Sequence, residues 1–126
     1  MLSIFSDPEE VLRRWATWLA EDGHLYIFGR FNSQPIDTQI LFRNHFDASP
    51  KWEGGLTSYS LEHISRGLEK DGYEVEARRF ALVGELAPSP NPIRTFTVEL
   101  ANGSKLVLNG ANVVAEHFFV IVTRRK

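Results

Sequence analysis

Two short stretches of this chain contain only apolar and aromatic side chains, and they constrain the fold more than any other feature. They are Leu25–Phe28 and Phe118–Val122. A strand that is apolar on both faces is typical of the interior of an α/β sheet, where other layers cover both sides. The sequence therefore predicts a layered α/β domain with these two strands inside its sheet.

A strongly signalled helix precedes the first of these strands. Asp7 is a good N-cap, Pro8 suits the first helical position, and Glu10 completes an Asp-x-x-Glu capping box. Gly23 permits a left-handed exit from the helix. We predict a helix over Pro8–Ala20 whose buried stripe consists of Val11, Leu12, Trp15, Trp18 and Leu19.

The rest of the chain alternates between helix, strand and loop signals. Ser60 reads as a helix N-cap, Asp71-Gly72 as a helix stop, and Asn102-Gly103 as a hairpin turn. The predicted segments are a polar loop over 29–35, a helix over 36–46, a loop over 47–55, a helix over 61–70, a strand over 73–83, a loop over 84–92, hairpin strands over 95–100 and 105–108, and a last strand over 117–123. Together they predict a single α/β domain over 1–126, with a mixed sheet of about five strands and roughly two or three helices.

Composition excludes several classes of function. The 126 residues include no cysteine, so disulfides, thiolate metal sites and cysteine nucleophiles are excluded. The net charge is −2, which argues against a nucleic-acid partner, and no apolar run reaches the roughly 20 residues of a membrane-spanning helix. No metal-ligand spacing joins His24, His45, His63 and His117, so we expect no metal site. We expect a cytoplasmic protein without a membrane partner.

Two segments resemble parts of a known enzyme family. The first, Asp7–Phe31, reads DPEEVLRRWATWLAEDGHLYIFGRF, and the second, Ser58–Val75, reads SYSLEHISRGLEKDGYEV. The first is similar to the segment that links the fourth and fifth strands of class I S-adenosylmethionine-dependent methyltransferases, and the second to their last crossover helix. The resemblance implies half of a Rossmann-like methyltransferase fold, with His117–Arg124 as a strand lying antiparallel between the fifth and sixth strands. The hairpin at 95–108 would be an insertion.

The same resemblance implies S-adenosylmethionine as the cofactor of the complete fold. In that family a glycine-rich loop upstream of the matching region holds the cofactor, and this sequence contains no Gly-x-Gly-x-Gly loop. We therefore expect a methyltransferase-like substrate-side domain that binds no cofactor alone and is completed by an N-terminal half or a second chain. The alternative is a non-catalytic domain that binds a small molecule or a protein.

Candidate site residues follow the first predicted strand, because ligands in open α/β sheets collect beyond the carboxyl ends of the strands. His45 is the candidate general base. The expected substrate-binding residues are Arg30, Asn32, Asp37, Asn44 and Trp52. The alternative for each is a solvated loop position, and for Trp52 a plug in a groove.

The predicted sheet leaves one strand edge unpaired and one apolar face without helices. In the resembled fold, the strand Leu25–Phe28 has a neighbour on each side, and one of those neighbours belongs to the part that this sequence lacks. The predicted helices cover one face of the sheet. Apolar edges and faces favour association, so we expect a homodimer or a complementary N-terminal half.

Overall fold

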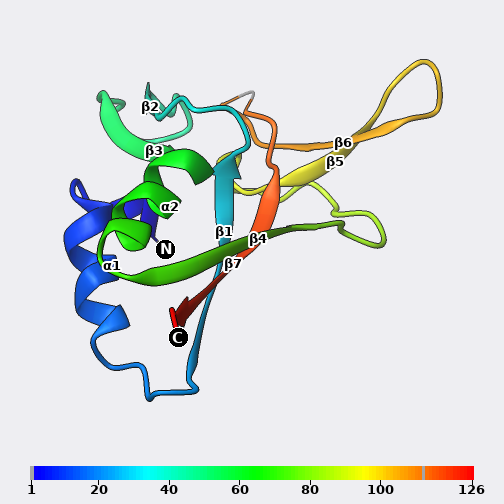
Figure 1. The fold of residues 1–126 in the computed structure, drawn as a ribbon. Helices are drawn as coiled ribbons and strands as arrows, with labels where there is room; N and C mark the ends of the chain where they lie inside the picture. Colours follow the sequence, from blue (N-terminus) through cyan, green and yellow to red (C-terminus); the bar gives the residue numbers. More distant parts are fainter. Residues whose placement is uncertain (1, 112) are drawn as a thin grey trace.

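The computed structural model describes residues 2–111 and 113–126 and contains a five-stranded sheet, two α-helices and a separate hairpin (Figure 1). The elements in chain order are η1 (Leu2–Ile4), α1 (Pro8–Ala16), β1 (His24–Asn32), β2 (Thr38–Phe42), β3 (Glu53–Ser60), α2 (Leu61–Lys70), β4 (Tyr73–Phe80), β5 (Phe96–Glu99), β6 (Lys105–Leu108) and β7 (His117–Arg124). The predicted α/β class with a mixed five-stranded sheet is confirmed.

The strand order of the sheet is β2-β3-β1-β7-β4. β7 runs antiparallel to both β1 and β4, while β1 and β3 are parallel. The predicted position of the last strand, antiparallel between the first strand and the strand after α2, is therefore observed. β5 and β6 form their own two-stranded sheet, which projects on the side of the main sheet opposite to the helices (Figure 1).

Both helices begin where the sequence predicts. The Asp7 side chain accepts a hydrogen bond from the backbone N–H of Glu10 at 3.0 Å, and Ser60 Oγ accepts one from the N–H of His63 at 3.1 Å. α1, however, ends at Ala16 instead of Ala20, because the next backbone hydrogen bonds tighten to an i→i−3 pattern. The prediction that Trp18 belongs to the core is wrong, since its side chain is 70% exposed.

The segment between β1 and α2 differs most from its predicted structure. A helix was expected over 36–46 and a loop over 47–55, but β2 and β3 form an antiparallel pair there. The pair contains an irregularity at which Ile40 is opposite Leu56 and Leu41 is opposite Gly54, so that Gly55 is left without a partner. A Cβ atom at Gly55 would overlap the ring of Phe42, and this close approach explains a glycine inside a strand.

The β2–β3 pair also changes the environment of β1. Among the described residues, Leu25–Phe28 has no ladder partner on the side away from β7, as predicted, but β1 extends beyond them and pairs there with β3, Phe31 with Tyr59 and Asn32 with Ser60. β1 also continues through residues 29–32, which had been predicted as a loop. The chain itself therefore supplies the neighbouring strand, after turning back through β2.

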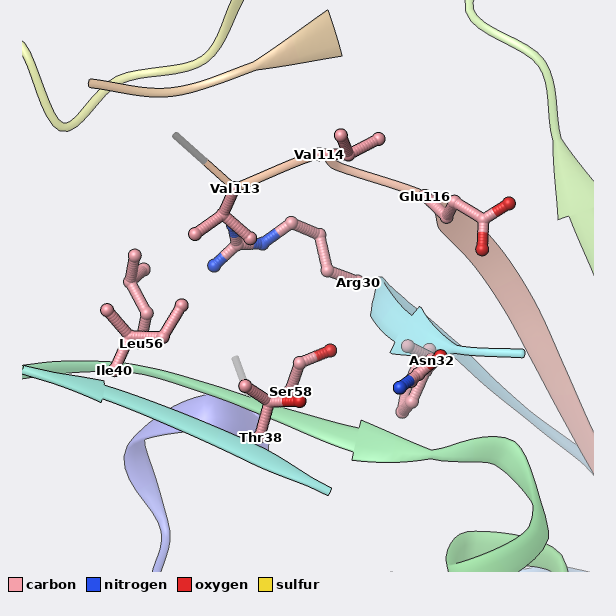
Figure 2. A pocket seen from close by; sticks show the side chains of 10 residues that line it. Arg30, Asn32, Thr38, Ile40, Leu56, Ser58, Val113, Val114 and Glu116 are labelled. Carbon is pink, nitrogen blue, oxygen red and sulfur yellow. The ribbon is translucent and has the colours of Figure 1, made fainter. Parts of the chain in front are cut away.

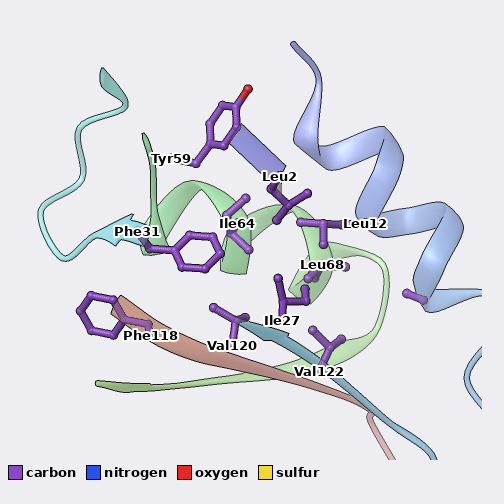
Figure 3. Close-up of a cluster of buried hydrophobic side chains, with 11 residues drawn as sticks. Leu2, Leu12, Ile27, Phe31, Tyr59, Ile64, Leu68, Phe118, Val120 and Val122 are labelled. Atoms are coloured by element: carbon purple, nitrogen blue, oxygen red, sulfur yellow. The ribbon is translucent and has the colours of Figure 1, made fainter. Parts of the chain in front are cut away.

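The core lies between the helices and one face of the sheet (Figure 3). Ile27 and Phe31 of β1 alternate with residues that point to the other face, as the two-residue period of a strand requires. The buried cluster consists of Leu2, Leu12, Ala16, Ile27, Phe31, Tyr59, Ile64, Leu68, Phe118, Val120 and Val122. Both α1 and α2 contribute to this one cluster, so they cover the same face.

The other face of β1, β7 and β4 carries exposed aromatic side chains. Phe28 lies 5.2 Å from Phe80 and 5.0 Å from Phe119, measured between ring centroids, and Tyr26 is 62% exposed. Large apolar side chains on a wet sheet face form a surface that commonly serves an interaction. We call this surface, made of Tyr26, Phe28, Phe80, Phe119 and Ile121, the aromatic face.

Candidate functional site

A cavity of about 270 Å³ lies at the carboxyl end of β1, on the face of the sheet opposite to the helices (Figure 2). Strand β1 supplies Arg30, because alternation along the strand turns this residue away from the core residues Ile27 and Phe31. The remaining walls come from the β2–β3 pair and from the segment that leads into β7. They include Thr38, Ile40, Leu56, Ser58, Val113, Val114 and Glu116.

The Arg30 side chain is the main charged group within this cavity. It extends between Val113 and the β2–β3 pair, whereas the Glu116 carboxylate is turned to the other side (Figure 2). Glu116 is engaged elsewhere, at 3.0 Å from the guanidinium of Arg79 and 3.1 Å from Ser33 Oγ. Across the described residues, no carboxylate lies within ion-pair distance of Arg30.

Partial burial makes this free cation chemically significant. Burial lowers the pKa of the Arg30 guanidinium from its usual value, because desolvation disfavours the charged form. An arginine nevertheless stays charged at neutral pH and offers donors in a planar fork. A half-buried guanidinium beside the hydroxyls of Thr38 and Ser58 is suited to an anionic ligand such as a carboxylate or a phosphate.

His117 lies beside Arg30 in the adjacent strand, where the two residues are register partners. Burial lowers the pKa of His117 most, and the positive charge of Arg30 lowers it further, against a smaller opposing effect of a hydrogen bond with the Ala115 backbone. The imidazole stacks on Phe28 with ring centroids 5.5 Å apart. The lowered pKa favours the neutral imidazole, and Arg30 is the cation beside it that has no carboxylate partner among the described residues.

Asn32 lines the cavity, but its side chain also shapes the loop that follows β1. Its amide nitrogen donates to the carbonyl of Ile36 at 2.8 Å, and its amide oxygen accepts from the N–H of Gln34 at 2.9 Å. Of the predicted binding residues, only Arg30 and Asn32 meet in one cavity. Through these hydrogen bonds, Asn32 mainly fixes the loop after β1 that borders the cavity.

Asp37 belongs to a different cluster. Its carboxylate accepts a hydrogen bond from the N–H of Ser60 at 2.7 Å and lies 2.5 Å from Nδ1 of His63. Burial alone raises the pKa of Asp37, but the hydrogen bonds from Ser60 and His63 outweigh burial and lower that pKa below its usual value of 3.8. The structure thus gives Asp37 a role in joining the loop after β1 to α2.

The other predicted residues lie farther along the chain. Asn44 and His45 line a second hollow of about 230 Å³ together with Pro92 and Ile93. Trp52 is 63% exposed, and the guanidinium carbon of Arg43 lies 4.8 Å from its ring centroid. His45 therefore does not line the Arg30 cavity, and Trp52 stacks with an arginine of its own chain.

Several cavity residues had not been identified from the sequence. Val113 reaches the cavity because the buried side chain of Asn109 accepts hydrogen bonds from the N–H groups of Ala111 and Val113, at 3.1 and 3.3 Å. Leu56 and Ser58 arrive through the unexpected strand β3. Only the Asn109-Gly110 turn signal hints at this arrangement in the sequence.

Two further properties concern the part of the chain that the structure describes. Residues 2–111 and 113–126 contain no cluster of three or more acidic or histidine side chains that could hold a metal ion. None of the described helices is both long enough and apolar enough to cross a membrane. Comparison with protein-family models, curated proteins and solved structures finds no match.

Proposed function

We propose that this chain is the substrate side of a methyltransferase-like domain, corresponding to half of a Rossmann-like fold. The observation that supports the proposal is the position of β7, antiparallel between the mutually parallel strands β1 and β4. The methyltransferase resemblance implies this order for the last three strands. The common placement of α1 and α2 on one face is compatible with it.

The Arg30 cavity is the substrate site in this proposal. It lies beyond the carboxyl end of β1, where open α/β sheets bind their ligands. The guanidinium binds and orients an acidic group of the substrate, and the apolar side chains of Ile40, Leu56 and Val113 hold its carbon skeleton. This chain contributes binding and orientation to the reaction.

The methyl donor requires a site that this sequence does not encode. The sequence has no Gly-x-Gly-x-Gly loop, so another segment or chain supplies the contacts to S-adenosylmethionine. The test is to isolate the protein from its source with any accompanying segment and measure S-adenosylmethionine binding by calorimetry. Binding in the low micromolar range supports the proposal. Absence of binding by a preparation that contains the accompanying segment or chain contradicts it.

A second candidate function rests on the composition of the cavity. Its described lining offers a cation and hydroxyls but neither a histidine nor an unengaged carboxylate that could act as a general base. This arrangement favours a domain that binds a small anion without transforming it. The second candidate and the first share the Arg30 site and differ in the methyl donor.

The shared anion site has its own test. Titration of the ¹⁵N-labelled chain with phosphate, and separately with acetate, is expected to shift the backbone signals of Ser58 and Val113. Arg30→Gln should abolish these shifts, while Arg43→Gln, which removes an exposed arginine outside the cavity, should retain them. Unchanged shifts in Arg30→Gln would show that the anion site lies elsewhere.

A further inference from the structure

Strand β4 forms one edge of the main sheet, and of the features that usually protect such edges it has charged side chains but neither a proline nor a bulge. It is eight residues long, contains no proline and pairs with β7 along its whole length without a register shift. The opposite edge strand, β2, is shorter and is interrupted by an irregularity after Ile40. Because open edges invite pairing with another strand, proteins normally shorten, bulge, charge or cover them, and charges leave open only pairings in which they are matched.

The outer side of β4 is free to pair. Apart from its ladder with β7, no residue of 73–80 exchanges a backbone hydrogen bond with another described segment. Alternate N–H and C=O groups of an edge strand point outward and remain available. The exposure of Glu76, Ala77 and Arg78 agrees with an uncovered edge.

The charges along β4 are self-complementary. Glu76 and Arg78 flank Ala77, and both charged side chains point to the same face of the sheet because they are two residues apart. When two copies of this strand pair antiparallel with Ala77 opposite Ala77, each Glu76 faces an Arg78 of the other copy. In the neighbouring register with Arg78 opposite Arg78, the like charges meet without a compensating pair. The register with Glu76 opposite Glu76 also pairs each Glu74 with an Arg78, but it brings two carboxylates together at the axis.

We propose that a second copy of this chain docks on β4, with the two β4 strands antiparallel and Ala77 at the two-fold axis. The sheets of the two copies then form one continuous sheet, with an isologous interface. Within one copy, Arg78 Nε lies 2.6 Å from Glu76 Oε1, but the two side chains are 66% and 57% exposed. Arg78 Nη2 also donates to Glu76 Oε2 at 3.0 Å, so the pair is bidentate. In the dimer each guanidinium exchanges this partner for the carboxylate of the other copy, and the number of ion pairs per chain stays the same.

This interface does not depend on the proposed function. It leaves the Arg30 cavity free, because that cavity is built from β1, β2, β3 and the segment before β7. It also differs from an association through the aromatic face, in which Tyr26 would become buried. Because Glu76 and Arg78 lie on the same face as Tyr26, a variant of Tyr26 is needed beside the charge variants to separate the two modes of association.

Sedimentation velocity across the micromolar range tests the interface. The wild-type chain is expected to form a dimer. Glu76→Arg places an arginine opposite Arg78 of the other copy at both symmetry-related positions. The dissociation constant of the dimer should rise by roughly tenfold or more. The double variant Glu76→Arg/Arg78→Glu restores opposite charges and should regain the wild-type dissociation constant.

Two further variants serve as controls, each with its fold checked by circular dichroism. Glu62→Arg reverses a comparably exposed, ion-paired glutamate on α2 and should leave the dimer unchanged. Tyr26→Ser alters the aromatic face and should also leave it unchanged. A monomeric wild-type chain, a dimer that resists Glu76→Arg, or a dimer that is lost in Tyr26→Ser would overturn the proposal.

Discussion

Oδ2 of Asp37 lies 2.5 Å from Nδ1 of His63, and this contact joins the loop after β1 to the first turn of α2. The other carboxylate oxygen accepts the Ser60 N–H, and the second ring nitrogen of His63 lies 3.3 Å from Glu9 on α1. One carboxylate thus connects the rim of the Arg30 cavity to both helices through a single histidine.

Asp37→Asn should lower the free energy of unfolding at pH 7 by about 0.5–1.5 kcal/mol, because it weakens the hydrogen bonds from Ser60 and His63. The effect should fall at the low end of that range, since 37% of the Asp37 side chain is exposed and solvent screens the pair. Urea melts of the variant and the wild type measure the difference.

The same comparison has a defined pH dependence. The pKa of Asp37 is lower in the folded state than its usual 3.8, so the unfolded chain binds the proton more tightly. The stabilisation is complete well above pH 3.8 and is lost as pH falls through the folded-state pKa. A difference between Asp37→Asn and wild type that grows on acidification would refute this role.

Leu12→Ala should destabilise the protein by roughly 2–5 kcal/mol, because Leu12 is fully buried between α1 and the rest of the core. Trp18→Ala should change stability by only about 0.5 kcal/mol, since Trp18 is exposed. Leu19→Ala should fall between them, because Leu19 is partly buried against the core. Thermal or urea melts rank the three variants, and equal effects would contradict the packing of α1.

Arg30→Gln should raise the pKa of His117 towards its usual value of 6.5, because it removes a neighbouring positive charge. Arg43→Gln removes an arginine that stacks on Trp52, outside the Arg30 cavity, and should leave the pKa of His117 unchanged. Titration of the His117 imidazole signals by NMR measures both. No change in the Arg30→Gln variant would mean that the guanidinium does not act on this corner of the sheet.

Gly103→Ala should destabilise the β5–β6 hairpin by about 1–2 kcal/mol, because Gly103 has φ +79°, in the left-handed region. Asn102→Ala should cost less, because it removes only the two hydrogen bonds that Asn102 Oδ1 accepts from the N–H and hydroxyl of Ser104 in an exposed turn. Hydrogen exchange of the Lys105–Leu108 amides reports on the hairpin directly. A greater loss of protection in Asn102→Ala would refute this ranking.

The elements that sequence reasoning identified correctly depend on local chemistry. Asp7 and Ser60 cap their helices with side chains that bond three residues ahead, and such signals are visible in the sequence alone. The Asn102-Gly103 turn and the apolar strand β7 are local in the same sense. These features fixed the α/β class and the order of most elements.

The β2–β3 pair could not be predicted because its causes are non-local. Ile36, Ile40 and Leu41 have helical spacing, and Gly54-Gly55 resembles a loop, yet the close approach of Gly55 to Phe42 makes the glycine fit a strand. The cavity was missed for the same reason. Arg30 follows an apolar run and was identified, whereas Ser58 and Val113 join it only through the fold.

The central claim is that this chain forms the substrate-binding side of a methyltransferase-like domain and has no site of its own for the methyl donor. The most direct test is calorimetric titration of this chain alone with S-adenosylmethionine and S-adenosylhomocysteine. The proposal predicts no binding in the low micromolar range, because the sequence contains no glycine-rich loop to hold the cofactor. A dissociation constant in the low micromolar range for either compound would contradict it.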